Sequence, residues 1–182
     1  MHELILGGRK SGKSRCAESR AADWLSTSGR EALLIATALP GDEEMRERIA
    51  HHRQSRSLRL PALQTLEVPR DLAAALRTYS SVRTLVVVDC LTLWLTQLLM
   101  PLRGPALDES ACQSHVASLA QVLTQAAGPI VMVSNEIGLG VSPLEPETRR
   151  FLDRLGELHQ RLAAVCERVT LMVAGIECRV KP

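Results

Sequence analysis

Glycine, lysine and serine at fixed spacing form the clearest chemical motif of the sequence. The stretch GGRKSGKS at residues 7–14 fits G-x-x-x-x-G-K-[ST] and directly follows an apolar run. In this pattern glycines let backbone N–H groups surround a phosphate, Lys13 reaches the β- and γ-phosphates, and the Ser14 hydroxyl binds Mg²⁺. The sequence therefore predicts a phosphate-binding loop made of Gly7, Gly8, Arg9, Lys10, Ser11, Gly12, Lys13 and Ser14.

Acidic and amide side chains follow two further apolar runs. Asp89 closes TLVVVD, the usual place for a carboxylate that organises Mg²⁺ directly or through water, although an aspartate there can also simply form a turn. Asn135 and Glu136 follow another run, where capping of a turn and contact with a ligand are equally good interpretations. The guanine-reading pattern N-K-x-D is absent, so a regulatory GTPase fits poorly.

Two adjacent histidines lie in the stretch RERIAHHRQSR, residues 46–56. Periodicity predicts a helix over residues 43–54 whose apolar stripe holds Met45, Ile49 and His52. His51 is turned about 100° away from His52, onto a polar face where Glu44 or Glu47 could orient its imidazole. Local sequence favours a half-buried histidine beside an exposed one, but an imidazole close to a nucleotide's phosphates can act as a nucleophile or an acid.

Short apolar runs alternate with amphipathic patterns along the chain. Continuous apolar runs favour strands that are covered on both faces, as in a parallel sheet. The expected strands span residues 3–6, 32–37, 84–89, 129–135 and 169–175, and the expected helices include residues 13–25, 109–126 and 145–167. This alternation predicts an α/β fold, in which the candidate residues gather at the carboxyl ends of the strands.

Composition limits the classes of function. The net charge of +2 provides no basic field for nucleic acid, and the five scattered cysteines favour neither a disulfide framework nor a zinc site. No apolar run is long enough to span a membrane, and the N-terminus does not read as a signal peptide. We expect one cytoplasmic domain, residues 1–182, that binds neither nucleic acid nor membrane.

The assembled stretches resemble the bifunctional adenosylcobinamide kinase / adenosylcobinamide-phosphate guanylyltransferase family of cobalamin biosynthesis. RIAHH after an acidic turn, combined with NEIGLGVSP, carries most of the specificity, and the resemblance runs nearly end to end. The matching stretches are GGRKSGKSRCAE (7–18), LLIAT (33–37), DEEMRERIAHHR (42–53), VDCLTLWLTQLL (88–99), VSNEIGLGVSP (133–143), RFLDRLGELHQRLA (150–163) and VAGI (173–176).

This resemblance implies a P-loop NTPase-like, RecA-like fold with a mostly parallel sheet flanked by helices, assembled as a homotrimer. It implies phosphorylation of adenosylcobinamide by ATP or GTP with Mg²⁺, followed by transfer of GMP from GTP to adenosylcobinamide phosphate, which yields adenosylcobinamide-GDP. The family's guanylylated histidine, the first of its pair, maps to His51. A neutral imidazole would attack the α-phosphorus and later release GMP to the acceptor.

Matching positions carry the family's nucleotide site onto residues 7–14, Ala36, Thr37, Arg56, Glu67 and Asp89, with Ser14 and Asp89 at the metal. The segment before Glu67 departs from the pattern, with Leu63 in place of the usual Trp and a longer spacer. Either Arg56 or Arg59 could therefore take the place of the family's arginine. Asp89 replaces the glutamate of some relatives, and Trp94 is as readily a core residue as a ligand contact.

Two other functions remain open from the residues. One is a P-loop kinase of another small metabolite, in which His51 is only structural. The other is a nucleotide-binding module without catalysis, which the presence of Lys13, Ser14 and Asp89 disfavours.

Overall fold

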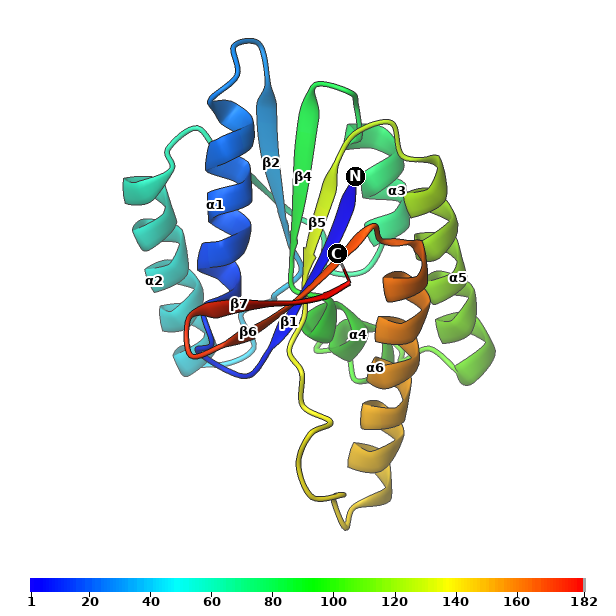
Figure 1. Cartoon of the computed structure of the whole chain (residues 1–182). Helices are drawn as coiled ribbons and strands as arrows, with labels where there is room; N and C mark the ends of the chain where they lie inside the picture. The colour runs from blue at the N-terminus through cyan, green and yellow to red at the C-terminus, as the bar shows by residue number, and fades with distance from the viewer. Residues whose placement is uncertain (182) are drawn as a thin grey trace.

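A single seven-stranded sheet forms the centre of the computed structural model, which describes residues 1–181 (Figure 1). The strand order is β3-β2-β4-β5-β1-β6-β7, and all neighbouring strands are parallel except β6 and β7. The strands are β1 (His2–Gly7), β2 (Glu31–Ala36), β3 (Gln64–Glu67), β4 (Thr84–Asp89), β5 (Ile130–Val133), β6 (Arg168–Val173) and β7 (Ile176–Lys181). The predicted α/β class with a mostly parallel sheet is confirmed.

Helices cover both faces of this sheet (Figure 1). They are α1 (Lys13–Leu25), α2 (Glu43–Arg59), α3 (Leu72–Tyr79), α4 (Leu91–Leu99), α5 (Glu109–Gln125) and α6 (Pro146–Val165). Because side chains alternate along a strand, Ile5, Val87 and Val133 pack in one apolar cluster with Ala17 of α1. Their neighbours in the strands pack in a second cluster with α3, α4, α5 and α6, which includes Leu4, Val86, Val88, Met132, Leu76, Trp94, Leu119 and Leu158.

Four elements were not expected from the sequence, and each has a physical reason. Helix α4 has nine residues and none of them is exposed, so its sequence is a short apolar run that does not distinguish a buried helix from a strand. Strand β3 has only four residues at one sheet edge, and β7 is exposed along most of its length. Helix α3 has only eight residues.

Trp94, which the sequence left as either a core residue or a ligand contact, is a core residue. It is fully buried, and its indole N–H donates to the Arg70 carbonyl at 2.7 Å.

The order of the strands brings distant residues to one edge of the sheet. Strand β5 lies between β1 and β4, and Val133 is paired in register with both Ile5 and Asp89. On the other side of β4, Ala36 is paired with Asp89. The carboxyl ends of β1, β2, β4 and β5 therefore meet, which is where ligands bind in open α/β sheets. Within residues 1–181, no helix is both long and apolar enough to cross a bilayer.

Candidate active site

The phosphate-binding loop connects β1 directly to α1. Gly12 caps α1 in the left-handed region at φ 104° and no side chain caps the helix, so the first-turn N–H groups are left for an anion. The Ser11 N–H donates to the Gly8 carbonyl at 3.2 Å, which closes the turn. The Lys13 ammonium donates to the same carbonyl at 2.6 Å and therefore lies against the loop it is predicted to serve.

The turn between β6 and β7 supports this loop from behind. The Gly175 N–H donates to the Ser11 carbonyl at 3.0 Å. Gly7 is paired in register with Met172, and a Cβ at Gly7 would lie 2.6 Å from the Met172 carbonyl oxygen. The first glycine of the motif is thus required by packing against β6, in addition to any need for close approach to a phosphate.

Asp89 ends β4 at the same edge and is half-buried. Burial raises the pKa of its carboxyl group, while the charges of His52, Arg56 and Lys13 oppose that shift. Burial lowers the pKa of the Lys13 ammonium, and Asp89 is one of the groups that raise it again. Lys13 and Asp89 therefore share one electrostatic environment with His52, Arg48 and Arg56 of the helix that carries the two histidines.

Thr37 holds the end of β4 in place. It is fully buried, its hydroxyl donates to the Cys90 carbonyl at 2.7 Å, and the same hydroxyl accepts the Cys90 N–H at 2.9 Å. The Thr37 N–H also donates to the Asp89 carbonyl at 3.0 Å. Ala36 is paired in register with both Asp89 and Glu67, so these three residues are neighbours at the ends of β2, β4 and β3.

Asp42 caps helix α2, and its carboxylate accepts the Met45 N–H at 2.7 Å. Desolvation lowers the pKa of His52, with Asp89 the largest opposing charge and Arg48 one turn away adding to the decrease. Arg48 also lowers the pKa of Lys13. Glu44, one turn before Arg48 on the same face of α2, forms an ion pair with Arg9, so this face of the helix lies next to the phosphate loop.

The predicted core stripe of α2 is wrong at His52. Met45 and Ile49 are half-buried, but His52 is exposed and the only buried residue of the helix is Arg56. The helix lies beside α1 at the edge of the molecule (Figure 1), and its side chains Arg53 and Arg56 meet Glu67 and Thr65 of β3 rather than a second core. His51 is exposed beside His52, with the two ring centres 6.3 Å apart.

Glu44, one of the two carboxylates considered for His51, has a different partner. Glu44 forms an exposed ion pair with Arg9 of the phosphate loop at 3.7 Å. This contact joins the first turn of α2 to the loop. Glu44 is therefore paired with Arg9 and does not orient the His51 ring.

A hollow of about 420 Å³ separates the second half of α2 from β3 and the turn before it. Its size is that of a site for a small ligand. The lining residues are Arg53, Arg56, Ser57, Pro61, Leu63, Thr65 and Glu67. Leu63, the residue that stands where the family has Trp, therefore forms part of the wall, and Glu67 forms an ion pair with Arg53 across it.

The two arginines between which the sequence could not choose have different partners. Arg56 is buried, lines the hollow, and donates to the Thr65 hydroxyl at 3.2 Å. Arg59 is directed to α1, where its guanidinium donates to both carboxylate oxygens of Glu18 at 2.9 and 3.1 Å. Arg56 thus faces the hollow and Asp89, whereas Arg59 joins the end of α2 to α1.

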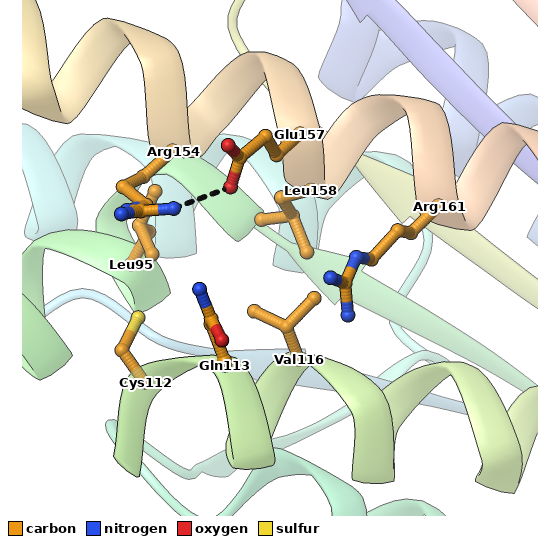
Figure 2. Close-up of a pocket in the computed structure, with 8 residues that line it drawn as sticks. All are labelled: Leu95, Cys112, Gln113, Val116, Arg154, Glu157, Leu158 and Arg161. Atoms are coloured by element: carbon orange, nitrogen blue, oxygen red, sulfur yellow. Dashed lines mark hydrogen bonds and ion pairs between the residues drawn. The ribbon is translucent and has the colours of Figure 1, made fainter. Parts of the chain in front are cut away.

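A second, much smaller hollow lies between α5 and α6, on the sheet face opposite α1 (Figure 2). Its volume of about 10 Å³ holds at most one water molecule. Arg154 and Glu157 form a hydrogen bond of 2.7 Å at its rim, and Leu95, Cys112 and Val116 close its floor (Figure 2). It is too small to hold a substrate.

Three residues near the site were not singled out from the sequence. The sequence patterns assign no separate role to Arg48 or Glu18. His159 of α6 is buried and hydrogen-bonded to Ser134 at the end of β5. In the sequence, the signal for this residue is its place among the leucines of α6, because a polar side chain buried on an apolar stripe needs a hydrogen-bond partner.

Comparison with known proteins agrees with this arrangement. The family model for cobinamide kinase / cobinamide phosphate guanyltransferase matches residues 3–180. The bifunctional adenosylcobalamin biosynthesis protein CobP of Pseudomonas aeruginosa is 47% identical over 182 residues, covering 100% of this chain and 98% of that protein. The protein CobU of Salmonella typhimurium, which has the same description, is 33% identical over 187 residues, covering 98% of each chain.

A likeness in fold extends further. The flagellar accessory protein FlaH of Methanocaldococcus jannaschii superposes with a TM-score of 0.52 at 11% identity, covering 99% of this chain and 77% of that one. This likeness concerns the fold alone and agrees with the predicted P-loop NTPase-like, RecA-like class. The phosphate loop and the aspartate that ends β4 lie at one edge of the sheet, next to helix α2 with its two histidines, and relatives match the chain over its full length. The chain therefore belongs to the cobinamide kinase / cobinamide phosphate guanyltransferase family.

Proposed function

We propose that this chain catalyses both reactions of its family. It phosphorylates the hydroxyl of adenosylcobinamide from ATP or GTP, and it then transfers GMP from GTP to adenosylcobinamide phosphate, yielding adenosylcobinamide-GDP. The observation that carries this proposal is the ion pair between Arg9 of the phosphate loop and Glu44 of α2, which brings the helix that holds both histidines next to the loop that contains Lys13. One triphosphate site can then serve both transfers.

For the kinase reaction, Lys13 and the loop N–H groups bind the β- and γ-phosphates. Triphosphate oxygens compete with the Gly8 carbonyl for the Lys13 ammonium, which lies 2.6 Å from that carbonyl. The hydroxyl of Ser14 and the carboxylate of Asp89 are hard oxygen ligands, and one or two such groups with phosphate oxygens suffice for Mg²⁺. The metal, when bound, neutralises charge on the transferred phosphoryl group.

For the guanylyl reaction, His51 is the proposed nucleophile, as the family resemblance implies. A nitrogen of its neutral imidazole bonds to the α-phosphorus while the bond to the bridging oxygen breaks, and pyrophosphate leaves. The adenosylcobinamide phosphate oxygen then displaces the imidazole and takes GMP. Because the two rings are neighbours 6.3 Å apart, the guanylyl carrier is tested with a variant of each histidine.

The hollow beside β3 is the proposed site for the nucleoside. Its volume of about 420 Å³ suits a nucleoside-sized ligand. Arg56 supplies a buried positive group at its wall. Glu67 supplies a carboxylate that can accept hydrogen bonds from base or ribose, although it must give up part of its ion pair with Arg53 to do so.

An assay with GTP labelled at the α-phosphate tests the guanylyl step. We expect a protein adduct that is labile in acid and stable in base, present in the wild type and in His52→Ala, and absent from His51→Ala. His52→Ala is the matched control because the two rings are neighbours on one exposed stretch of helix. Label that survives His51→Ala and disappears in His52→Ala would assign the carrier to His52 instead.

One alternative is a P-loop kinase of another small metabolite without guanylyl transfer, in which His51 has no catalytic role. That alternative predicts no label in any variant, together with turnover of a different acceptor. The same assay therefore separates the two functions.

We also propose that residues 1–182 form one domain that acts in the cytoplasm as a homotrimer. The single continuous sheet supports the first statement. Exposed apolar side chains after β5, at Leu139, Val141 and Leu144, support self-association. Light scattering coupled to size-exclusion chromatography should give three times the 19.9 kDa chain mass, and the monomer mass would contradict the trimer.

A further inference from the structure

A chain of buried hydrogen bonds runs behind the site, on the sheet face away from α1. His159 Nε2 of α6 lies 2.7 Å from the Ser134 hydroxyl, and this hydroxyl lies 3.0 Å from the Thr92 hydroxyl of α4. The Thr92 oxygen accepts the Asn135 N–H at 2.8 Å. His159, Ser134 and Thr92 are all at least nine-tenths buried, so the chain is shielded from water and its geometry is well defined.

His159 also approaches the residue on the other side of Asn135. Its Nδ1 lies 3.8 Å from a carboxylate oxygen of Glu136, whose other oxygen accepts the Gly138 N–H at 2.7 Å. The Glu136 N–H donates to the Gly7 carbonyl at 3.0 Å. One imidazole thus contacts both neighbours of Asn135, and the same segment is bonded to the first glycine of the phosphate loop.

Strand register places Asn135 beside the site. Val133 is paired with Ile5 and Asp89, and the hydrogen bonds from Ser134 to Ile5 and from Glu136 to Gly7 continue this parallel ladder. Asn135 is therefore level with Gly7.

Side-chain alternation gives the face on which Asn135 lies. Val133 and Val87 pack on the α1 side of the sheet, so Asn135 and Asp89, each two residues further on, occupy that same side. Ser134 lies on the opposite side, where it meets His159. Asn135 and Asp89 therefore flank the phosphate loop from two neighbouring strands.

We propose that His159 is a positioning residue for phosphoryl transfer, and that the group it positions is Asn135, whose carboxamide contacts the terminal phosphoryl group of the nucleoside triphosphate. This inference rests on the proposed kinase function. Within residues 1–181 the hydrogen bond at Asn135 is made by its backbone, which leaves the carboxamide N–H for a phosphoryl oxygen.

In the reaction, the acceptor oxygen bonds to the γ-phosphorus, the bond to the β–γ bridging oxygen breaks, and the hydroxyl proton is released to solvent. Charge spreads over the oxygens of the transferred group as this happens. A donor that is already fixed in place stabilises that charge without having to reorganise. The buried chain through Ser134 and Thr92 supplies this fixation from behind the sheet.

Steady-state kinetics of the full chain with ATP and adenosylcobinamide test this inference. Asn135→Ala should lower kcat by about 100-fold, the effect of losing one fixed donor, while the KM for ATP changes by less than about threefold. His159→Leu should lower kcat at least about tenfold in the same pattern. His159→Gln should recover most of the rate, because its amide can still bond to Ser134.

A double variant separates positioning from a general structural effect. If His159 acts through Asn135, adding His159→Leu to Asn135→Ala should lower kcat by less than about twofold more. Leu158→Ala, at the fully buried neighbour in α6, is the matched control and should keep a normal kcat below its unfolding temperature.

Two results overturn the inference while leaving the proposed function intact. One is a wild-type kcat in Asn135→Ala, and the other is a double variant whose losses multiply. A wild-type chain that does not phosphorylate adenosylcobinamide overturns the proposed function first, and the inference with it.

Discussion

Replacement of Gly7 by alanine tests the packing that shapes the phosphate loop. Gly7 adopts φ +152°, and an added Cβ would lie 2.6 Å from both the Met172 carbonyl oxygen and the Ser11 hydroxyl oxygen. The Ser11 side chain can rotate, but the Met172 oxygen belongs to the backbone of β6, which is paired with β1 at this residue. Relief of the contact therefore requires that β1 and β6 separate or that the loop moves.

The cost of Gly7→Ala has two parts. A non-glycine residue in a sparsely populated backbone region costs about 1–3 kcal/mol. Forcing a methyl group against a packed backbone costs about 1–3 kcal/mol more. The sum, about 2–6 kcal/mol, corresponds to a decrease in Tm of roughly 4–24 °C for a chain of this size. Because the loop carries the phosphate site, nucleotide affinity should fall as well.

Thermal unfolding with and without GTP measures both effects, and isothermal titration gives the affinity. Gly8→Ala is the matched control, since a Cβ at Gly8 meets nothing within 4 Å and its backbone is unstrained. Its Tm should stay within about 2 °C of the wild type, the usual range for an exposed substitution. Equal Tm values for Gly7→Ala and Gly8→Ala would refute the packing argument.

Three further outcomes follow from other contacts. Lys13→Ala should weaken both phosphoryl and guanylyl transfer when each is assayed separately, because one ammonium holds the triphosphate for both; undiminished guanylyl transfer would contradict a shared site. Arg20→Met should lower the free energy of unfolding in urea by at most about 3–5 kcal/mol, because Glu3, only 1% exposed, loses the guanidinium that donates to it at 2.9 and 3.2 Å. Glu3 keeps the Thr170 hydroxyl at 2.7 Å and Arg168 at 3.7 Å, and Glu3→Gln in that background should recover part of the loss. Hydrogen bonding by Arg20 lowers the pKa of Glu177 below 4.5, so its stabilisation is present above that pH and is lost as pH falls through the lowered value. Acid unfolding should therefore be less steep in Glu177→Gln, and an unchanged profile would count against this contribution.

The sequence alone was enough for the phosphate loop, the strand that ends in Asp89 and the α/β class. These features depend on local patterns, namely a glycine–lysine motif with required spacing and continuous apolar runs of strand length. The same locality explains the errors. Periodicity placed His52 on an apolar stripe, but α2 packs its inner face against a polar strand edge, and no local pattern records what a helix faces.

Only the tertiary structure decided which distant residues meet. The insertion of β5 between β1 and β4 places Asn135 beside Gly7 and Asp89, and it puts Ser134 within reach of His159, 25 residues further along the chain. The arginines of α2 were likewise separated by their partners, with Arg56 at the hollow and Arg59 on Glu18. Strand order and helix docking are set by the combined burial of many side chains. The local sequence around a residue therefore does not show which distant residue it will contact.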